Sequence, residues 1–436
     1  MGSLMSLGAR AMTASYAVLQ TTGHNIANAS TAGYSRQQVG LQTATAQSTG
    51  SGFFGQGVDV KTVTRANDRF LTREAATSQS LAAADATRLD RLQQLEKVFP
   101  TGEEGLGHAA DQLMNAFVDV ASRPQDAASR QVVLARAEDT AARCRDAGER
   151  IAGLQADVTQ ALKVSVGQLG ALAQGVAHAN AQIVSQRGSG QPPNDLLDER
   201  DRLVGQIGKL VQVSTVAADD GSLSLFIGGG QRLVLGSEAT TVSAVIDPFD
   251  PAQVNIAVRE SGADRILPQG MLVGGSIAGL VRFQNQDLKT ARDTVGQLAA
   301  ALGGAVNLQQ SLGLDLKGAN GAPIFAAAVP RVLPASGNAK APDGSYVASS
   351  VVGGVRVSSV AASIVDATRL LPTDYELRAD PADPVGTYRL TRLSDGLVRS
   401  VSAGSVVDGV RLDVSAPAPA AGDRFLLQPV SVLRNV

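Results

Sequence analysis

One segment of the chain, from about residue 125 to 187, keeps an unbroken spacing of three and four residues between its apolar and small side chains. This spacing places those side chains along one face of a single continuous helix. At 1.5 Å per residue such a helix is about 90 Å long, which is typical of rods and coiled coils. The side chains on this face are Ile151, Leu154, Val158, Leu162, Ser165, Leu169, Leu172, Val176 and Ile183.

Further helices are predicted on both sides of this segment. Residues 66–99 keep helical spacing until Pro100 stops them, and a shorter helix carries Leu106 to Val120. Asn194 is expected to cap a helix that follows the turn RGSGQPPN, and another helix covers 277–310. From Val211 to about Val258 the period changes to two, and after Pro323 strand signals recur about every ten residues.

These signals predict the α+β class with several domains: a long-helix rod or bundle with a β-rich portion, followed by an all-β outer domain. At about 150 residues per domain, 436 residues correspond to about three domains. Residues 1–65 are predicted to be an assembly helix with an extended linker, mobile in the monomer. Residues 66–325 form the helical rod with strands inserted at about 211–270, and 326–436 the outer domain.

The first 58 residues hold only two Asp, Glu, Lys or Arg side chains, Arg10 and Arg36. A seam of apolar and small residues with 3–4 spacing predicts a helix that ends near Gly23–Asn28, before a loop and extended chain rich in glycine. Such a helix is weak alone in water, because nucleation is costly and no charged face supports it. The segment is therefore either a disordered tail or a helix that becomes ordered in an assembly, through the seam Leu4, Leu7, Ala11, Ala14 and Val18.

Composition argues against several classes of protein. The net charge of −2 and the pI of about 6.0 give no basic surface for nucleic acid, and no run of 18 apolar residues is present to span a membrane. A single Cys rules out an internal disulfide framework, and the three His are scattered, so no metal site is expected. The N-terminus lacks the apolar core and cleavage site of a secretory signal peptide.

Four motifs with possible chemistry have simpler interpretations. Gly50–Gly55 spells G-x-G-x-x-G but lacks the preceding strand and following helix of a nucleotide site, and Ser276 is better interpreted as a helix cap than as a nucleophile. The acidic run from Asp195 to Asp201 is interleaved with arginines, which indicates a solvated helix face rather than a Ca²⁺ loop. Cys144 is an ordinary helix cysteine. We expect no enzyme, no catalytic or metal residues and no cofactor.

The leader then carries a family resemblance. The stretch TTGHNIANASTAGYSRQQV resembles the N-terminal signature of axial proteins of the bacterial flagellum. The segments DRFLTREAA, RPQDAASRQVVL, PPNDLLDERDRLVGQI and GSIAGLVRFQNQDLKTARDTVGQLA follow in the order seen in hook-associated proteins of the hook–filament junction, in particular the one nearest the hook. The signature residues are Asn25, Ile26, Ala27, Asn28, Gly33 and Tyr34.

The resemblance implies an extracellular structural subunit of the flagellum, exported through the type III apparatus without a cleaved signal peptide. It implies as partners the hook protein, the next junction protein toward the filament, like subunits in a ring, and an export chaperone. It also implies a C-terminal helix paired with the N-terminal one, yet the sequence ends at SVLRNV without that heptad pattern, so this part is expected to be missing. Alternatives are a filament- or hook-type axial protein, a non-flagellar secreted coiled-coil scaffold, and an enzyme on an α+β scaffold.

Overall fold

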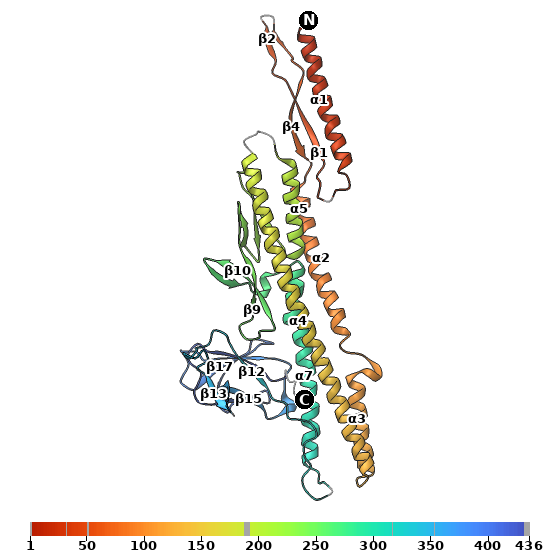
Figure 1. The fold of residues 1–436 in the computed structure, drawn as a ribbon, viewed down its shortest axis with the longest axis vertical. Coiled ribbons are helices and arrows are strands. Elements are labelled where there is room, and N and C mark those ends of the chain that lie inside the picture. Colours follow the sequence, from red (N-terminus) through yellow and green to blue (C-terminus); the bar gives the residue numbers. More distant parts are fainter. Residues whose placement is uncertain are drawn as a thin grey trace. The chain divides into compact units, whose positions relative to one another are not determined.

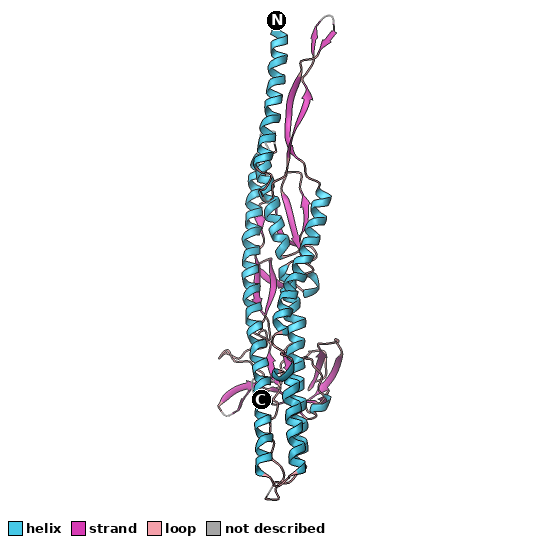
Figure 2. Ribbon diagram, turned by 90° about the vertical axis from the view of Figure 1, so that its right-hand side faces the viewer, coloured by secondary structure: helices cyan, strands magenta, loops and turns pink. Residues whose placement is uncertain are grey.

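The computed structural model describes residues 2–31, 33–49, 52–186, 192–315, 317–352 and 354–430. Long helices and antiparallel sheets alternate along the chain, which confirms the predicted α+β class (Figures 1 and 2). The chain divides into two compact units, each assembled from three stretches of sequence. The first unit is Met1–Arg88, Leu162–Val245 and Asn255–Val281, and the second is Leu89–Ala161, Ile246–Val254 and Arg282–Val436. The three predicted domain ranges stay a prediction.

Among the described residues, five α-helices contribute to the first unit. They are α1 (Gly2–Ala27), the first part of α2 (Arg69–Glu96), the later part of α4 (Ala127–Gln186), α5 (Asn194–Leu210) and α6 (Ser276–Arg282), with a short 3-10 turn at Gln269–Met271. The long helix predicted from about 125 to 187 is therefore confirmed within two residues at each end. Asn194, by contrast, does not cap α5, because it is the first helical residue and its Nδ2 donates to the carbonyl of Val63, 2.9 Å away.

The strands of the first unit form small antiparallel sheets. β1 pairs with β4, β2 with β3, β5 to β8 form one sheet in sequence order, and β9, β10 and β11 form another. The bounds are β1 (Gln37–Thr43), β2 (Gln47–Thr49), β3 (Gly52–Phe54), β4 (Val58–Arg65), β5 (Ser214–Ala217), β6 (Leu223–Ile227), β7 (Gln231–Leu235), β8 (Glu238–Ala239), β9 (Val242–Ile246), β10 (Val254–Glu260) and β11 (Ala263–Ile266). The last residue of β9 and the first of β10 belong to the second unit.

The extended linker predicted after the first helix is a long β-hairpin. β1 and β4 pair antiparallel from Gln37↔Arg65 to Thr43↔Val58, with an irregularity between Gly40 and Leu41. The short pair β2–β3 lies between these strands in sequence, so the hairpin continues toward its tip. Backbone pairing of this length turns a polar, glycine-rich stretch into ordered strand, although its side chains show little alternation.

In the first unit, α4 is tied to the sheet that begins at β5 by one buried amide. Asn180 is fully buried and donates to the carbonyls of Leu223 (2.9 Å) and Gly236 (2.8 Å), while its oxygen accepts from the backbone N–H of Leu223 at 3.0 Å. A second tie is steric: a Cβ at Gly279 of α6 would lie 2.4 Å from the carbonyl oxygen of Ala84 in α2. The two backbones approach so closely that only glycine fits.

The helices of the second unit are the last part of α2, α3 (Leu106–Ser122), the first part of α4 and α7 (Lys289–Ser311), with 3-10 turns at Gly102–Glu104 and Ala367–Arg369. A π-helical segment, Phe283–Leu288, joins α6 to α7, so the helix predicted over 277–310 exists but is not uniformly α-helical. A small core of α3, α4, α7 and the segment after α7 contains Leu113, Ala116, Val133, Ala137, Val306 and Phe325.

The strands of the second unit come after α7, as the sequence predicts. A five-stranded sheet has the order β12–β21–β16–β17–β18, β13 pairs with β14, and β15, β20 and β19 form a third sheet. Figure 2 shows them in magenta. The bounds are β12 (Arg331–Pro334), β13 (Ser349–Val352), β14 (Val355–Ser358), β15 (Val360–Ile364), β16 (Tyr375–Arg378), β17 (Thr387–Arg392), β18 (Val398–Ser402), β19 (Val406–Val407), β20 (Val410–Val414) and β21 (Arg424–Gln428).

A buried ionic cluster connects α7 to the start of β16. Asp374 accepts from Lys289 Nζ at 2.7 Å and from Arg292 at 3.1 Å, and Asp293 accepts from the same two cations at 2.8 and 3.1 Å. Both carboxylates are almost completely buried. Burial, followed by the nearby charge of Asp374, raises the pKa of Asp293. Two cations thus neutralise two carboxylates, which is the arrangement that makes buried charge tolerable.

Candidate functional site: the N-terminal helix and its hairpin

α1 lies along its own hairpin. Figure 1 shows α1 beside β1 and β4, and the helix packs on both strands. Ala14, 4% exposed, is the buried side chain of this helix within the part whose side chains are described. A Cβ at Gly57 would lie 2.7 Å from Leu7 Cδ1, so the hairpin backbone approaches Leu7 closely. Arg10 pairs with Asp59 of β4 at 3.3 Å, on the exposed rim of the contact.

The opposite face of α1 is apolar and uncovered. Four of its side chains are spaced by seven residues, and a fifth lies beside them; each is between 68% and 82% exposed. We call this set the outer stripe: Met5, Met12, Tyr16, Leu19 and Ile26. A period of seven on a straight helix returns to nearly the same face, which is the signature of a helix that packs against another helix. This seven-residue spacing is visible in the sequence, but the predicted seam does not include the residues of the outer stripe.

The five residues of the predicted seam divide between these environments. Ala14 is buried on the hairpin side, and Leu7 lies against Gly57. Leu4, Ala11 and Val18 are exposed. The seam therefore straddles the edge of the hairpin contact, with four of its members at least partly open to a further partner, since Leu7 is still 37% exposed. Whether they contact other subunits stays a prediction, as does the mobility of residues 1–65 in the monomer.

The flagellar signature forms the joint between α1 and the hairpin. The side-chain oxygen of Asn25 accepts from the Tyr34 hydroxyl at 2.7 Å and from the backbone N–H of Gln37 at 2.8 Å, and its amide donates to the carbonyl of Gln37 at 2.8 Å. One side chain thus satisfies both backbone groups of the first residue of β1. The ring of His24 meets that of Tyr34 edge-on, with centroids 5.5 Å apart. Asn25 and Tyr34 therefore work as one unit.

The other signature residues have separate places. Gly33 has a φ of +86°, and a Cβ there would lie 3.1 Å from Cβ of Arg202 in α5, so glycine serves both the turn and the close contact. Asn28 donates to the His24 carbonyl at 3.0 Å and accepts from Thr31, which closes the end of α1. Ile26 belongs to the outer stripe, and Ala27 is exposed.

α5 fixes the base of this joint. Asp198 accepts from the backbone N–H of Ser35 at 3.3 Å and from Arg65 at 2.7 Å, and Asp201 accepts from the same guanidinium at 2.8 Å. Partial burial raises the pKa of Tyr34, and the negative charges of Asp198 and Asp195 raise it further. The hydroxyl therefore stays protonated and can donate its hydrogen bond. Because Asp198 and Arg200 are buried, the interpretation of this acidic run as a solvated helix face was wrong for these two residues.

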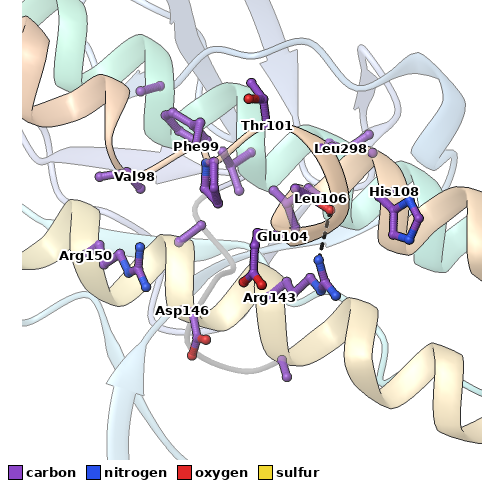
Figure 3. A pocket seen from close by; sticks show the side chains of 18 of the residues that line it. Val98, Phe99, Thr101, Glu104, Leu106, His108, Arg143, Asp146, Arg150 and Leu298 are labelled. Carbon is purple, nitrogen blue, oxygen red and sulfur yellow. Dashed lines mark hydrogen bonds between the residues drawn. The ribbon is translucent and has the colours of Figure 1, made fainter.

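The remaining candidates do not assemble a reactive site. A cavity of about 900 Å³ lies in the second unit between residues 98–108, α4 and α7 (Figure 3). Its wall includes Arg143, which donates to the carbonyls of Glu103 and Gly105; a dashed line in Figure 3 marks the bond to Gly105. Cys144 is buried, and burial raises the pKa of its thiol, which makes it less reactive. Gly52 begins β3, and Ser276 begins α6.

Within the described ranges, no group of three or more His, Cys, Asp or Glu side chains is placed to hold a metal ion. None of the helices described there is long and apolar enough to cross a membrane.

Comparisons with known proteins give consistent relatives. The family described as the flagellar hook-associated protein FlgK helical domain matches residues 92–325. Flagellar hook-associated protein 1 of Salmonella typhimurium is 30% identical over 438 residues, which cover 99% of this chain and 76% of that protein. The protein of the same name from Escherichia coli matches to the same extent. The solved structure of the flagellar hook junction protein FlgK from Burkholderia pseudomallei has a TM-score of 0.72 at 27% identity, over 83% of this chain and 64% of that one.

Proposed function

The chain belongs to the family of flagellar hook-associated protein 1, and from this premise we propose that α1 and its hairpin carry its assembly into the hook–filament junction. The protein is a structural component of the extracellular flagellum and not an enzyme. The observation that supports α1 as the assembly element is its pair of faces. One face of α1 packs on the hairpin through Ala14, and Asn25 hydrogen-bonds Gln37 of β1 on the same side. The other face exposes the outer stripe.

The energetics support an assembled role for that second face. Apolar side chains exposed along a helix gain about 25 cal/mol for each Å² that a partner covers. A partner helix with matching heptad spacing would cover the outer stripe together with Leu4 and Val18. The leader's low charge supports the same role, because a helix inside a packed assembly buries its sides and an unpaired charge there is costly.

The proposal also names the proteins that this subunit contacts in the flagellum. We place the hook protein on one side of the subunit, the next junction protein toward the filament on the other, and like subunits around it in a ring. Delivery would use the flagellar type III export apparatus and an export chaperone. The single Cys supports a route through a narrow channel, since no disulfide restrains the unfolded chain. If residues 1 to about 60 are mobile in the isolated chain, limited proteolysis should remove them before it cleaves α4.

The experiment is carried out in cells that lack this protein. Electron microscopy should show intact hooks without filaments, and the wild-type gene should restore filaments. Val18→Asp places a carboxylate on the open side of α1, so the variant should be secreted but not attached to hooks. Gln20→Asp is a matched control, because it adds the same charge at an exposed residue outside the predicted seam. Equal attachment of Val18→Asp and wild type would refute the assembly role, and loss of secretion would shift it to export.

A further inference from the structure

The loop between β9 and β10, residues 247–253, has the sequence DPFDPAQ and belongs to the second unit. The carboxylate of Asp247 accepts from the backbone N–H groups of Phe249 at 2.9 Å and Asp250 at 3.1 Å. Asp250 is 7% exposed, and its own carboxylate accepts from the N–H of Ala252 at 3.0 Å. Each of the two prolines also fixes a φ angle. Turn hydrogen bonds and prolines therefore give this loop a defined shape.

The end of the loop is bonded to helices of the same unit. The carbonyl of Ala252 accepts from the Thr159 hydroxyl of α4 at 2.7 Å and from Gln155 Nε2 at 3.3 Å. Gln284 in the π-helical segment is 1% exposed; it accepts from Gln155 at 3.1 Å and donates to the carbonyl of Val254 at 3.1 Å. An amide buried this deeply is costly to leave unpaired, so Gln284 holds α4 and the end of the loop together.

The start of the loop is bonded to the five-stranded sheet. The carbonyl of Pro248 accepts from the backbone N–H of Ser336, just after β12, at 2.7 Å. The guanidinium of Arg424 in β21 lies over the Phe249 ring, 5.0 Å from its centroid, which is a favourable cation–π contact. The same guanidinium donates to both carboxylate oxygens of Glu376 in β16, at 2.7 and 3.0 Å. The loop thus reaches the sheet beside β12 and at β21.

α7 holds the same sheet at another place. Lys289 and Arg292 of α7 bond Asp374 next to β16, and Gln297 donates to the carbonyl of Leu370 at 2.6 Å. A sheet held by one helix can rock about that helix, and relative motion is the ordinary behaviour of parts joined by a small interface. A second attachment, to another helix, removes this freedom. The loop supplies that attachment, because it joins the sheet to α4.

We propose that residues 247–253 form a strap that fixes the orientation of the five-stranded sheet on α4, and that release of either end of the strap lets the sheet rock about α7. The strap has the features that this role requires. It has a shape of its own, bonds to α4 and the π-helical segment at one end, and contacts with the sheet at the other. It is a property of the single chain, so it does not depend on the proposed role of α1.

Pulsed electron paramagnetic resonance on the purified full chain measures this orientation as the distance between two spin labels. In a Cys144→Ala background, which removes the single thiol, labels are attached at Glu149→Cys in α4 and Ser400→Cys in β18, both exposed positions. β18 is the edge of the sheet farthest from β12, so a rocking motion moves it most. We expect a narrow distance distribution for this pair while the strap is intact.

Two variants release the strap from opposite ends. Thr159→Val with Gln155→Ala removes the side chains of α4 that hold Ala252, and should broaden the distance distribution by about twofold or more. Phe249→Ala removes the ring beneath Arg424 at the sheet end and should also broaden the distribution. Because the two variants touch different elements, a folding defect in one leaves the other as a test.

Thr294→Val is the matched control, because the Thr294 hydroxyl donates to the Thr290 carbonyl of its own helix and not to the strap. A second label pair, Arg331→Cys in β12 and Ser400→Cys, lies within the sheet and should stay narrow in every variant, which separates rocking from unfolding. Wild-type width between residues 149 and 400 in both release variants would overturn the proposal. Equal broadening by Thr294→Val, or broadening of the 331–400 pair along with the 149–400 pair, would overturn it as well.

Discussion

Replacing Asn25 with Ala should loosen the joint between α1 and the hairpin without unfolding the rest of the chain. The substitution removes three hydrogen bonds, to the Tyr34 hydroxyl and to the backbone N–H and C=O of Gln37. At about 0.5–1.5 kcal/mol each, the sum is about 1.5–4.5 kcal/mol. Asn25 is only half-buried, so water can replace part of this, and we expect about 2 kcal/mol.

Amide hydrogen exchange measures this effect where it arises. About 2 kcal/mol corresponds to roughly 30-fold faster exchange through local opening, and the amide of Gln37 should report it first. Tyr34→Phe removes one of the three bonds, so its effect should be about a third as large in free energy. Amides of α3 and α7, which belong to the second unit, should keep the protection they have in the wild type.

Asn28→Ala serves as the control, because Asn28 bonds only to its own helix end and to Thr31. It should leave the Gln37 amide as protected as in the wild type. The reasoning about the joint would be refuted if Asn25→Ala left Gln37 equally protected, or if Asn28→Ala exposed it to the same degree.

Other predictions follow from contacts elsewhere in the chain. Asn180→Leu should lower stability by about 3–5 kcal/mol, since it leaves the N–H and C=O of Leu223 and the C=O of Gly236 buried without that partner; a calorimetric loss under 1 kcal/mol would contradict this. Gly279→Ala should cost about 2 kcal/mol or more by thermal melting, because its Cβ would lie 2.4 Å from the Ala84 carbonyl, whereas Gly270→Ala, with open space around it, should be nearly neutral. The hydrogen bond from Arg392 lowers the pKa of Asp395 from 3.8 to about 2, so this pair stabilises the fold above pH 3.8 and the effect disappears as the pH falls through 2. Melting curves of Asp395→Asn and wild type should therefore differ slightly at pH 7 and converge near pH 2.

Long local patterns were the part of the fold that the sequence predicted well. α4 was expected from about 125 to 187 and runs from Ala127 to Gln186, because sixty residues of unbroken 3–4 spacing leave little room for another structure. The hairpin at β1 to β4 was instead expected as loop and extended chain. β1 consists largely of Gln, Gly and Thr and shows no clear alternation, whereas β4 begins with the strand-like VDVKTV; the two strands form because each supplies the backbone partner of the other.

Contacts between distant segments were the part that the sequence could not supply. Asp198 and Arg200 have the local pattern of a solvated helix face, but both are buried. Asp198 accepts hydrogen bonds from Arg65 and from the backbone N–H of Ser35, and Arg200 donates to the carbonyl of Gly221 at 2.9 Å. The tight approach of Gly279 to Ala84 likewise depends on two helices almost two hundred residues apart. Local periodicity reports which face is apolar and not which neighbour covers it.

The same distinction explains why the candidate assembly seam and the outer stripe differ. A 3–4 pattern that starts at Leu4 and one that starts at Met5 are both present in α1, because Leu, Met, Ala and Val occur around most of the helix. In an isolated helix nothing decides between two such stripes. In this structure the hairpin distinguishes the two stripes, because Leu7 packs against Gly57 and the strands cover Ala14. The opposite face of α1 is therefore the one that a partner can cover. A helix that is apolar on more than one side needs more than one neighbour, and the described residues of this chain supply one of them, the hairpin.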